Sequence, residues 1–166
     1  GITLVTYHAD CLPVYLYDPA HQAIALLHAG WRGTVDNIVS AGLEKMRKAY
    51  GTRASDVIAG IGPGISAACY ETSEAVRILF AETFTDRDME RIFTEPHLGE
   101  DGARHWQLDL ALANHLLLQN AGVQEISDGG ICTYRNAKRL FSHRAQGAKR
   151  GLNAAFLGLP EEGGAR

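Results

Sequence analysis

Two short apolar runs near the start of the chain, residues 14–17 and 23–27, flank a polar segment of sequence Asp-Pro-Ala-His at 18–21. Asp and Pro both initiate turns, so this pattern of apolar and polar positions predicts a β-hairpin. A hairpin brings its two ends together. We therefore expect Cys11, before the first run, and His28, after the second, to lie side by side.

Apolar residues recur at helical spacing over three longer stretches. Over residues 35–50 they form one stripe, which predicts a helix with Thr34 as its N-cap and Gly51 after its last turn. The same kind of pattern predicts helices over residues 73–84 and 108–121.

Four other apolar runs are short and predict strands, at residues 2–5 (as a buried strand), 57–61, 123–126 and 153–159. Residues 86–104 are charged and rich in turn residues, which favours an exposed connection. Helices and strands alternate, but some strands join by hairpins. The pattern therefore predicts an α+β fold, with mixed β-sheets flanked by helices in a single domain over residues 1–166.

Composition narrows the classes of function. The formal net charge of −3 argues against a nucleic-acid binder, and no apolar run reaches the roughly 20 residues of a membrane span. The sequence opens without a basic-then-apolar leader, and its three widely spaced cysteines favour a reducing, cytoplasmic setting. The chain begins at Gly1, directly before a predicted strand, so we expect an N-terminal segment to have been removed or to be absent.

The expected pairing of Cys11 with His28 suggests a metal site. A thiolate beside an imidazole suits zinc or copper, and a catalytic zinc takes three protein ligands and keeps one open position. His8 is one candidate for the third ligand, but it is three residues from Cys11, so a bend must bring the two to one face. His143 is another candidate. Cys69 and Cys132 are interpreted as small buried hydrophobic residues.

Three arginines favour an anionic partner. Arg32 lies at the start of a predicted helix, where free N–H groups and the helix dipole attract anions. Arg144 and Arg150 flank a glycine-containing segment and could bind a phosphate or carboxylate in bidentate fashion.

Several motifs occur together and in a recognisable order: His-Ala-Asp-Cys-Leu-Pro-Val (8–14), His-Ala-Gly-Trp-Arg-Gly-Thr (28–34), Gly-Ile-Gly-Pro (60–63), Cys-Tyr-Glu (69–71), Asp-Leu (109–110), Cys-Thr (132–133) and Phe-Ser-His-Arg (141–144). Through these motifs the chain resembles, from end to end, the YfiH-like family, whose members are described both as polyphenol oxidoreductases (laccase domain) and as purine nucleoside phosphorylases. The resemblance implies an α+β fold of mixed sheets with helices outside.

The resemblance also implies a metal held by Cys11, His28 and a histidine upstream of the Ala-Asp-Cys strand. We expect that upstream segment to be absent, so His8, where the family often has Thr, is the candidate replacement. The implied activity is zinc-dependent: phosphorolysis of adenosine, inosine, guanosine and methylthioadenosine, and deamination of adenosine. Arg32, Arg144 and Arg150 would then hold phosphate, and Asp10 or Glu71 would shuttle a proton.

Two alternatives stay open. One is copper-dependent oxidation of phenols, for which a blue-copper centre takes two His, one Cys and a weak axial ligand; the His-x-His pairs of multicopper oxidases and an all-β pattern are missing from the sequence. The other is a metal-binding scaffold whose site is completed by a partner chain. Under both enzyme hypotheses the partner is a small molecule: a purine nucleoside with phosphate, or a phenol.

Overall fold

The predicted hairpin forms the centre of the fold. In the computed structural model, which describes residues 1–99 and 101–160, β2 (Leu12–Asp18) pairs antiparallel with β3 (Ala23–Ala29). On its other side β2 pairs antiparallel with β4 (Ile58–Ile61), which pairs in parallel with β8 (Glu125–Asp128). The sheet order is β3-β2-β4-β8, so the expectation of a mixed sheet is confirmed.

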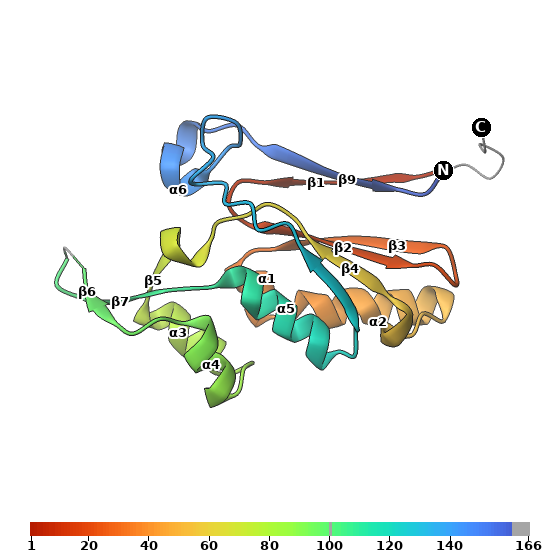
Figure 1. The fold of residues 1–166 in the computed structure, drawn as a ribbon, viewed down its shortest axis with the longest axis horizontal. Coiled ribbons are helices and arrows are strands. Elements are labelled where there is room, and N and C mark those ends of the chain that lie inside the picture. Colours follow the sequence, from red (N-terminus) through yellow and green to blue (C-terminus); the bar gives the residue numbers. More distant parts are fainter. Residues whose placement is uncertain (100, 161–166) are drawn as a thin grey trace.

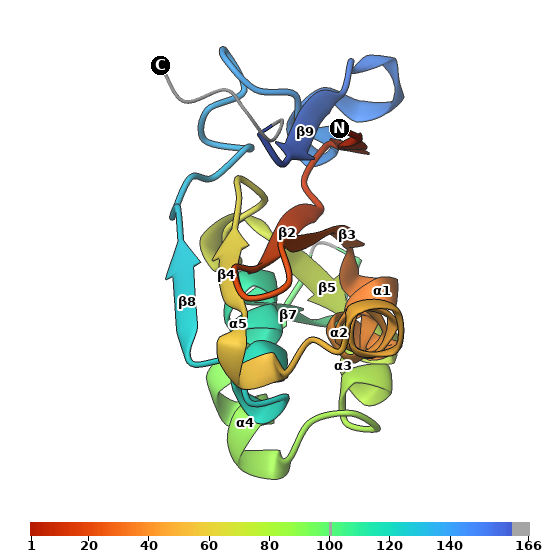
Figure 2. The same ribbon diagram turned by 90° about the vertical axis from the view of Figure 1, so that its right-hand side faces the viewer.

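Helices cover one face of this sheet (Figures 1 and 2). The short α1 (Trp31–Val35) and the longer α2 (Ile38–Tyr50) pack against β3, and α5 (Leu110–Asn120) packs against β4 and β8. The buried core lies between the two layers and includes Leu12, Val14, Leu16, Val39, Met46, Ile61, Ala113 and Leu117.

The helix predicted over residues 35–50 is interrupted near its start. Asn37 adopts a left-handed conformation (φ 52°), and its side chain accepts a hydrogen bond from the Ser40 N–H, so Asn37 is the N-cap of α2. The prediction of Thr34 as N-cap is therefore wrong: Thr34 is buried inside α1, where its hydroxyl donates to the Gly30 carbonyl. The predicted end is confirmed, because Gly51 closes the helix with φ of 79°.

A two-stranded ribbon covers the opposite face of the sheet (Figure 1). β1 (Thr3–His8) pairs antiparallel with β9 (Asn153–Gly158), and both strands contact β3. Only one side of the ribbon is packed, so the prediction of a buried strand at its start is wrong. Ile2 is 80% exposed, and Val5 and Phe156, which lie opposite each other, are also exposed.

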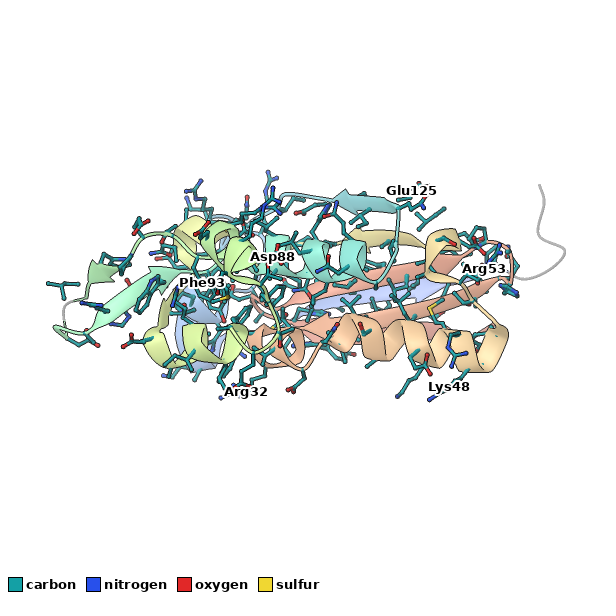
Figure 3. The ribbon with its side chains drawn as sticks, turned by 90° about the horizontal axis from the view of Figure 1, so that it is seen from below. Arg32, Lys48, Arg53, Asp88, Phe93 and Glu125 are labelled. Atoms are coloured by element: carbon teal, nitrogen blue, oxygen red, sulfur yellow. The ribbon has the colours of Figure 1, made fainter. Side chains whose placement is uncertain are left out.

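The remaining elements lie beyond one end of the main sheet. A small sheet has the order β5-β7-β6, formed by β5 (Glu71–Ser73), β7 (Arg104–Gln107) and β6 (His97–Leu98). It is accompanied by α3 (Glu74–Phe80) and α4 (Asp86–Ile92), and Figure 3 shows Asp88 of α4. The shorter elements are η1 (Ala54–Asp56), η2 (Ala67–Cys69), α6 (His143–Gln146) and η3 (Gly147–Lys149).

The stretch predicted as an exposed connection, residues 86–104, contains α4 and β6 and ends at the first residue of β7, so that prediction is wrong in part. Met89 and Ile92 of α4 are buried in the core although their neighbours are charged. Within residues 1–99 and 101–160, no helix has the length and apolar character needed to cross a bilayer.

Candidate metal-binding corner and adjoining cavity

A sharp bend between β1 and β2 builds the corner of the site. Asp10 has a positive φ of 89°, which is uncommon for a residue with a side chain, and it turns the chain so that Cys11 faces the end of β3. A methyl group placed on Gly30 would lie 2.7 Å from the Cys11 sulfur and 3.9 Å from Nε2 of His28. Cys11 and His28 thus lie around Gly30, side by side as the hairpin predicted.

His8, the last residue of β1, joins this corner by stacking. Its ring lies 4.6 Å from the His28 ring, centroid to centroid, with only 11° between the planes. Nε2 of His8 hydrogen-bonds with the Thr6 hydroxyl at 2.7 Å, while its buried Nδ1 has no hydrogen-bond partner among the described residues. Burial and the neighbouring His28 lower the pKa of His8 to about 4, so the ring is neutral at neutral pH.

The hydrogen bonds around Asp10 explain how the bend is held. One carboxylate oxygen accepts from the Thr133 hydroxyl at 2.6 Å, and the other accepts from the Arg144 N–H at 2.7 Å. The Asp10 carbonyl accepts from the Ile65 N–H. With both carboxylate oxygens engaged, Asp10 joins three distant segments of the chain, and proton transfer by Asp10 stays a prediction.

The side chains at this corner meet the requirements of a metal site only in part. Cys11 and His28 offer the soft sulfur and imidazole nitrogen that zinc and copper take. Ring nitrogen lone pairs lie in the plane of the ring, so two stacked, nearly parallel imidazoles do not point at one ion. Among the described residues, no group of three or more His, Cys, Asp or Glu side chains is arranged to hold a metal. Ligation by His8 requires its ring to leave the stack.

Without a metal ion, the surroundings of Cys11 favour its protonated thiol. Burial, and then the nearby Asp10 carboxylate, raise the pKa of the Cys11 thiol, although Arg150 acts in the opposite direction. A bound metal ion would displace the thiol proton, because coordination deprotonates a cysteine ligand.

A cavity of about 380 Å³ opens beside the corner. It is lined by Ala9, Asp10, Cys11, Trp31, Arg32, Ile65, Tyr70, Leu110, His143, Arg144 and Arg150. The three arginines predicted to bind an anion, which are far apart in the sequence, therefore line one cavity. His143, the alternative third ligand, also lines it.

Each arginine is held differently. Arg32 is exposed at the start of α1 (Figure 3). Its guanidinium lies 4.1 Å from the centre of the Trp31 ring. Arg144 donates to the Glu71 carbonyl at 2.9 Å and lies 5.3 Å from the centre of the Tyr70 ring. Nε of Arg150 is buried and, within the described part of the chain, has no hydrogen-bond partner.

The Glu71 side chain contacts two histidines of the small sheet, and Glu71 is not among the residues that line the cavity. Its carboxylate accepts from Nε2 of His97 at 2.8 Å and lies 3.6 Å from Nδ1 of His105. Glu71 contributes only its backbone carbonyl to the site, through Arg144. A proton shuttle by its carboxylate would require a rearrangement of this small sheet.

Sequence reasoning missed Tyr70 and Thr133 as site residues. Tyr70 is a wall of the cavity, and burial, followed by the neighbouring Cys11, raises the pKa of its phenol to about 12. Thr133 is buried, 1% exposed, and holds Asp10. Both belong to motifs that carried the family resemblance, Cys-Tyr-Glu and Cys-Thr, and this was the one available signal.

The fold and the corner define a mixed α+β protein in which a Cys–His pair adjoins an arginine-lined cavity. Residues 1–160 match the family model described as multi-copper polyphenol oxidoreductase laccase. The chain belongs to this family.

Its relatives carry a second description. The chain is 42% identical to a purine nucleoside phosphorylase of Bacteroides thetaiotaomicron over 91% of its own length and 54% of that protein. It is 33% identical to the purine nucleoside phosphorylase YlmD of Bacillus subtilis, over 97% of this chain and 56% of YlmD. The chain thus spans just over half the length of these relatives.

Solved structures show the same fold. The hypothetical protein YfiH of Bacillus licheniformis superposes with a TM-score of 0.85 and 31% identity, over 95% of this chain and 58% of that one. YlmD of Geobacillus stearothermophilus gives a TM-score of 0.81 and 30% identity, over 93% of this chain and 56% of that one. These neighbours support the predicted fold class.

Proposed function

We propose that this chain carries a metal-dependent purine nucleoside site, which performs phosphorolysis of adenosine, inosine, guanosine and methylthioadenosine and deamination of adenosine. The observation that carries the proposal is the cavity in which Arg32, Arg144 and Arg150 adjoin Cys11. The names of the relatives, purine nucleoside phosphorylases, point in the same direction.

The cavity provides for both parts of the phosphorolysis substrates. The arginines offer charged donors for inorganic phosphate, and Nε of Arg150, which has no hydrogen-bond partner among the described residues, is free to donate to it. Trp31 and Tyr70 offer flat apolar surfaces on which a purine can stack. Phosphate attacks C1′ of the ribose, the bond from C1′ to N9 breaks, and the base leaves with a proton. The products are the free base and ribose 1-phosphate.

Cys11 and His28 are the proposed metal ligands, with His8 as the third. Zinc is the proposed ion, and copper is the alternative. When bound, zinc supplies a Lewis acid and an activated water for the deamination. The neutral state of the His8 ring is the one that can ligate, provided that the ring leaves its stack on His28.

Activity measurements test the substrate. The chain is incubated with inosine and phosphate, and free hypoxanthine and ribose 1-phosphate are quantified; adenosine is used to detect ammonia. In the Arg150→Gln variant we expect the KM for phosphate to rise about tenfold or more, the size of a lost charge-assisted hydrogen bond. Arg104→Gln is the matched control, because Arg104 is exposed on β7 outside the cavity. Phenol oxidation with copper, without release of base, would overturn the proposal.

Metal analysis tests the ligands separately. Protein purified without added metal is analysed as wild type and as the variants Cys11→Ala, His28→Ala and His8→Ala. We expect the first two variants to lose the metal. Full metal content in either would refute this pair as ligands, and full content in His8→Ala would remove His8 from the set.

A further inference from the structure

Two cysteines that the proposed function does not use, Cys69 and Cys132, both hydrogen-bond with Ser66. Cys132 is buried, 7% exposed, and its sulfur accepts a hydrogen bond from the Ser66 N–H at 3.4 Å. The side chain of Cys69 lies close enough to this sulfur to lower the pKa of the Cys132 thiol. The two thiols are 63 positions apart in the sequence, yet the fold brings them near each other.

The backbone around this pair is well defined. Cys69 ends the short η2 helix, and its N–H donates to the Ser66 carbonyl at 2.9 Å, so Cys69 is one helical turn from the residue that binds the Cys132 sulfur. Gly64 forms a parallel bridge with Cys132, in which the Thr133 N–H donates to the Gly64 carbonyl at 2.9 Å. Both cysteines are therefore anchored to the same loop.

A second cavity gives access to the buried thiol. It has a volume of about 320 Å³, and Cys132, Ser66 and Arg135 are among the residues that line it. Cys69 is partly exposed. A small oxidant can therefore reach Cys132 through the cavity.

We propose that Cys69 and Cys132 form a reversible redox pair, which hydrogen peroxide converts into a disulfide. The Cys132 thiolate attacks one peroxide oxygen, the O–O bond breaks, and water leaves after protonation, which gives a sulfenic acid at Cys132. The Cys69 sulfur then attacks the Cys132 sulfur. The S–O bond breaks, and a second water leaves with the Cys69 proton. The two thiols lose two electrons and two protons, and hydrogen peroxide becomes two waters.

The surroundings of Cys132 favour the first step. Burial alone would raise the pKa of the Cys132 thiol, but hydrogen bonds from Ser66, the Arg135 N–H and Cys69 outweigh burial and lower it. Hydrogen-bond donors that stabilise the thiolate make a cysteine nucleophilic. The Cys69 thiol, which lies near the Cys132 sulfur, is placed to resolve the sulfenic acid before further oxidation.

The disulfide would join two segments of the chain, around residues 69 and 132, that flank the candidate site. Residue 70, next to Cys69, lines the arginine cavity, and residue 133, next to Cys132, holds Asp10. Oxidation would fix the spacing of these two segments covalently. This inference does not depend on the proposed nucleoside activity, because it concerns thiols outside the Cys11 corner.

Counting thiols tests the pair directly. The native chain is treated with hydrogen peroxide, denatured and alkylated, and the number of labels is read from the intact mass. We expect three labels before treatment and one after it, with recovery of three on reduction by dithiothreitol. Peptide mapping should find residues 69 and 132 in one linked peptide. Three labels after treatment, or a link that contains Cys11, would overturn the proposal.

Two variants resolve the order of the steps. In Cys69→Ser, which changes a partly exposed side chain, Cys132 should stop at the sulfenic acid and react with dimedone. In Cys11→Ser, a background with only the two thiols of interest, peroxide should reduce the labels from two to none. Failure of dimedone to label Cys132 in Cys69→Ser, or two labels retained in Cys11→Ser, would contradict the mechanism.

Discussion

The replacement of Thr133 by valine tests whether a single buried hydrogen bond holds the bend of the candidate site. The Thr133 hydroxyl donates to a carboxylate oxygen of Asp10 at 2.6 Å, and both residues are buried. Valine has nearly the same shape as threonine but cannot donate. The variant therefore removes the hydrogen bond and leaves one Asp10 oxygen without its partner, while the Arg144 N–H still binds the other.

The size of the effect follows from the charge of the acceptor. A hydrogen bond to a charged group contributes about 1.5–3 kcal/mol to the free energy of unfolding. The short distance and the burial place this one in that range. In a chain of this length each kcal/mol shifts the melting temperature by about 2–4 °C, so a loss of about 2 kcal/mol lowers it by about 4–8 °C.

Urea denaturation measures the loss, with the two variants Thr133→Val and Thr3→Val compared with the wild type. Thr3 is exposed on β1, so Thr3→Val should change the free energy of unfolding by less than about 0.5 kcal/mol. A change as small as this in Thr133→Val would refute the argument that the Thr133–Asp10 bond holds the bend.

Three further predictions follow from other contacts. Gly30→Ala should displace the Cys11 sulfur, since the added methyl group would lie 2.7 Å from it; metal content, with circular dichroism as the check on folding, measures the effect. Asn37→Ala should lose about 1 kcal/mol or more in thermal unfolding, because Asn37 caps α2 in a left-handed conformation, whereas Asn37→Gly should lose less. Burial alone would raise the pKa of Asp18, but hydrogen bonds from His21 and nearby N–H groups lower it. The ionised Asp18 therefore stabilises the fold above about pH 4, and this stability is lost as pH falls through the lowered pKa. When the free energy of unfolding is measured as a function of pH, the part of its acid dependence that comes from Asp18 should be absent from the Asp18→Asn variant. A variant whose acid dependence equals that of the wild type would contradict the assignment.

Local patterns predicted the hairpin because its signal is short-range: two apolar runs about an Asp-Pro turn. Since Cys11 and His28 follow directly from the hairpin, their proximity was predictable too. The start of α2 was not, because Thr34 and Asn37 are both good capping residues, and tertiary packing buries Thr34. α4 was missed because only Met89 and Ile92 face the core among charged neighbours.

Contacts between distant segments could not be predicted from spacing. The Thr133–Asp10 bond joins positions 123 residues apart. The cysteines at 69 and 132 were interpreted as isolated buried residues, and their proximity depends on the loop from Gly64 meeting the chain after β8. Likewise, the stacking of His8 on His28 depends on the positive φ of Asp10, which no residue pattern specifies.

The pairing of β1 with β9 has a consequence for the order in which the molecule forms. β1 is made well before β9, so on the ribosome these two strands cannot pair until synthesis has passed β9. The hairpin of β2 and β3 can form early, because its contacts are local, whereas pairing between strands so far apart in the sequence is slow. His8 is therefore the last of the three corner residues to be fixed in place. A newly made chain would pass through a stage in which Cys11 and His28 already lie together and the side later covered by the ribbon is open.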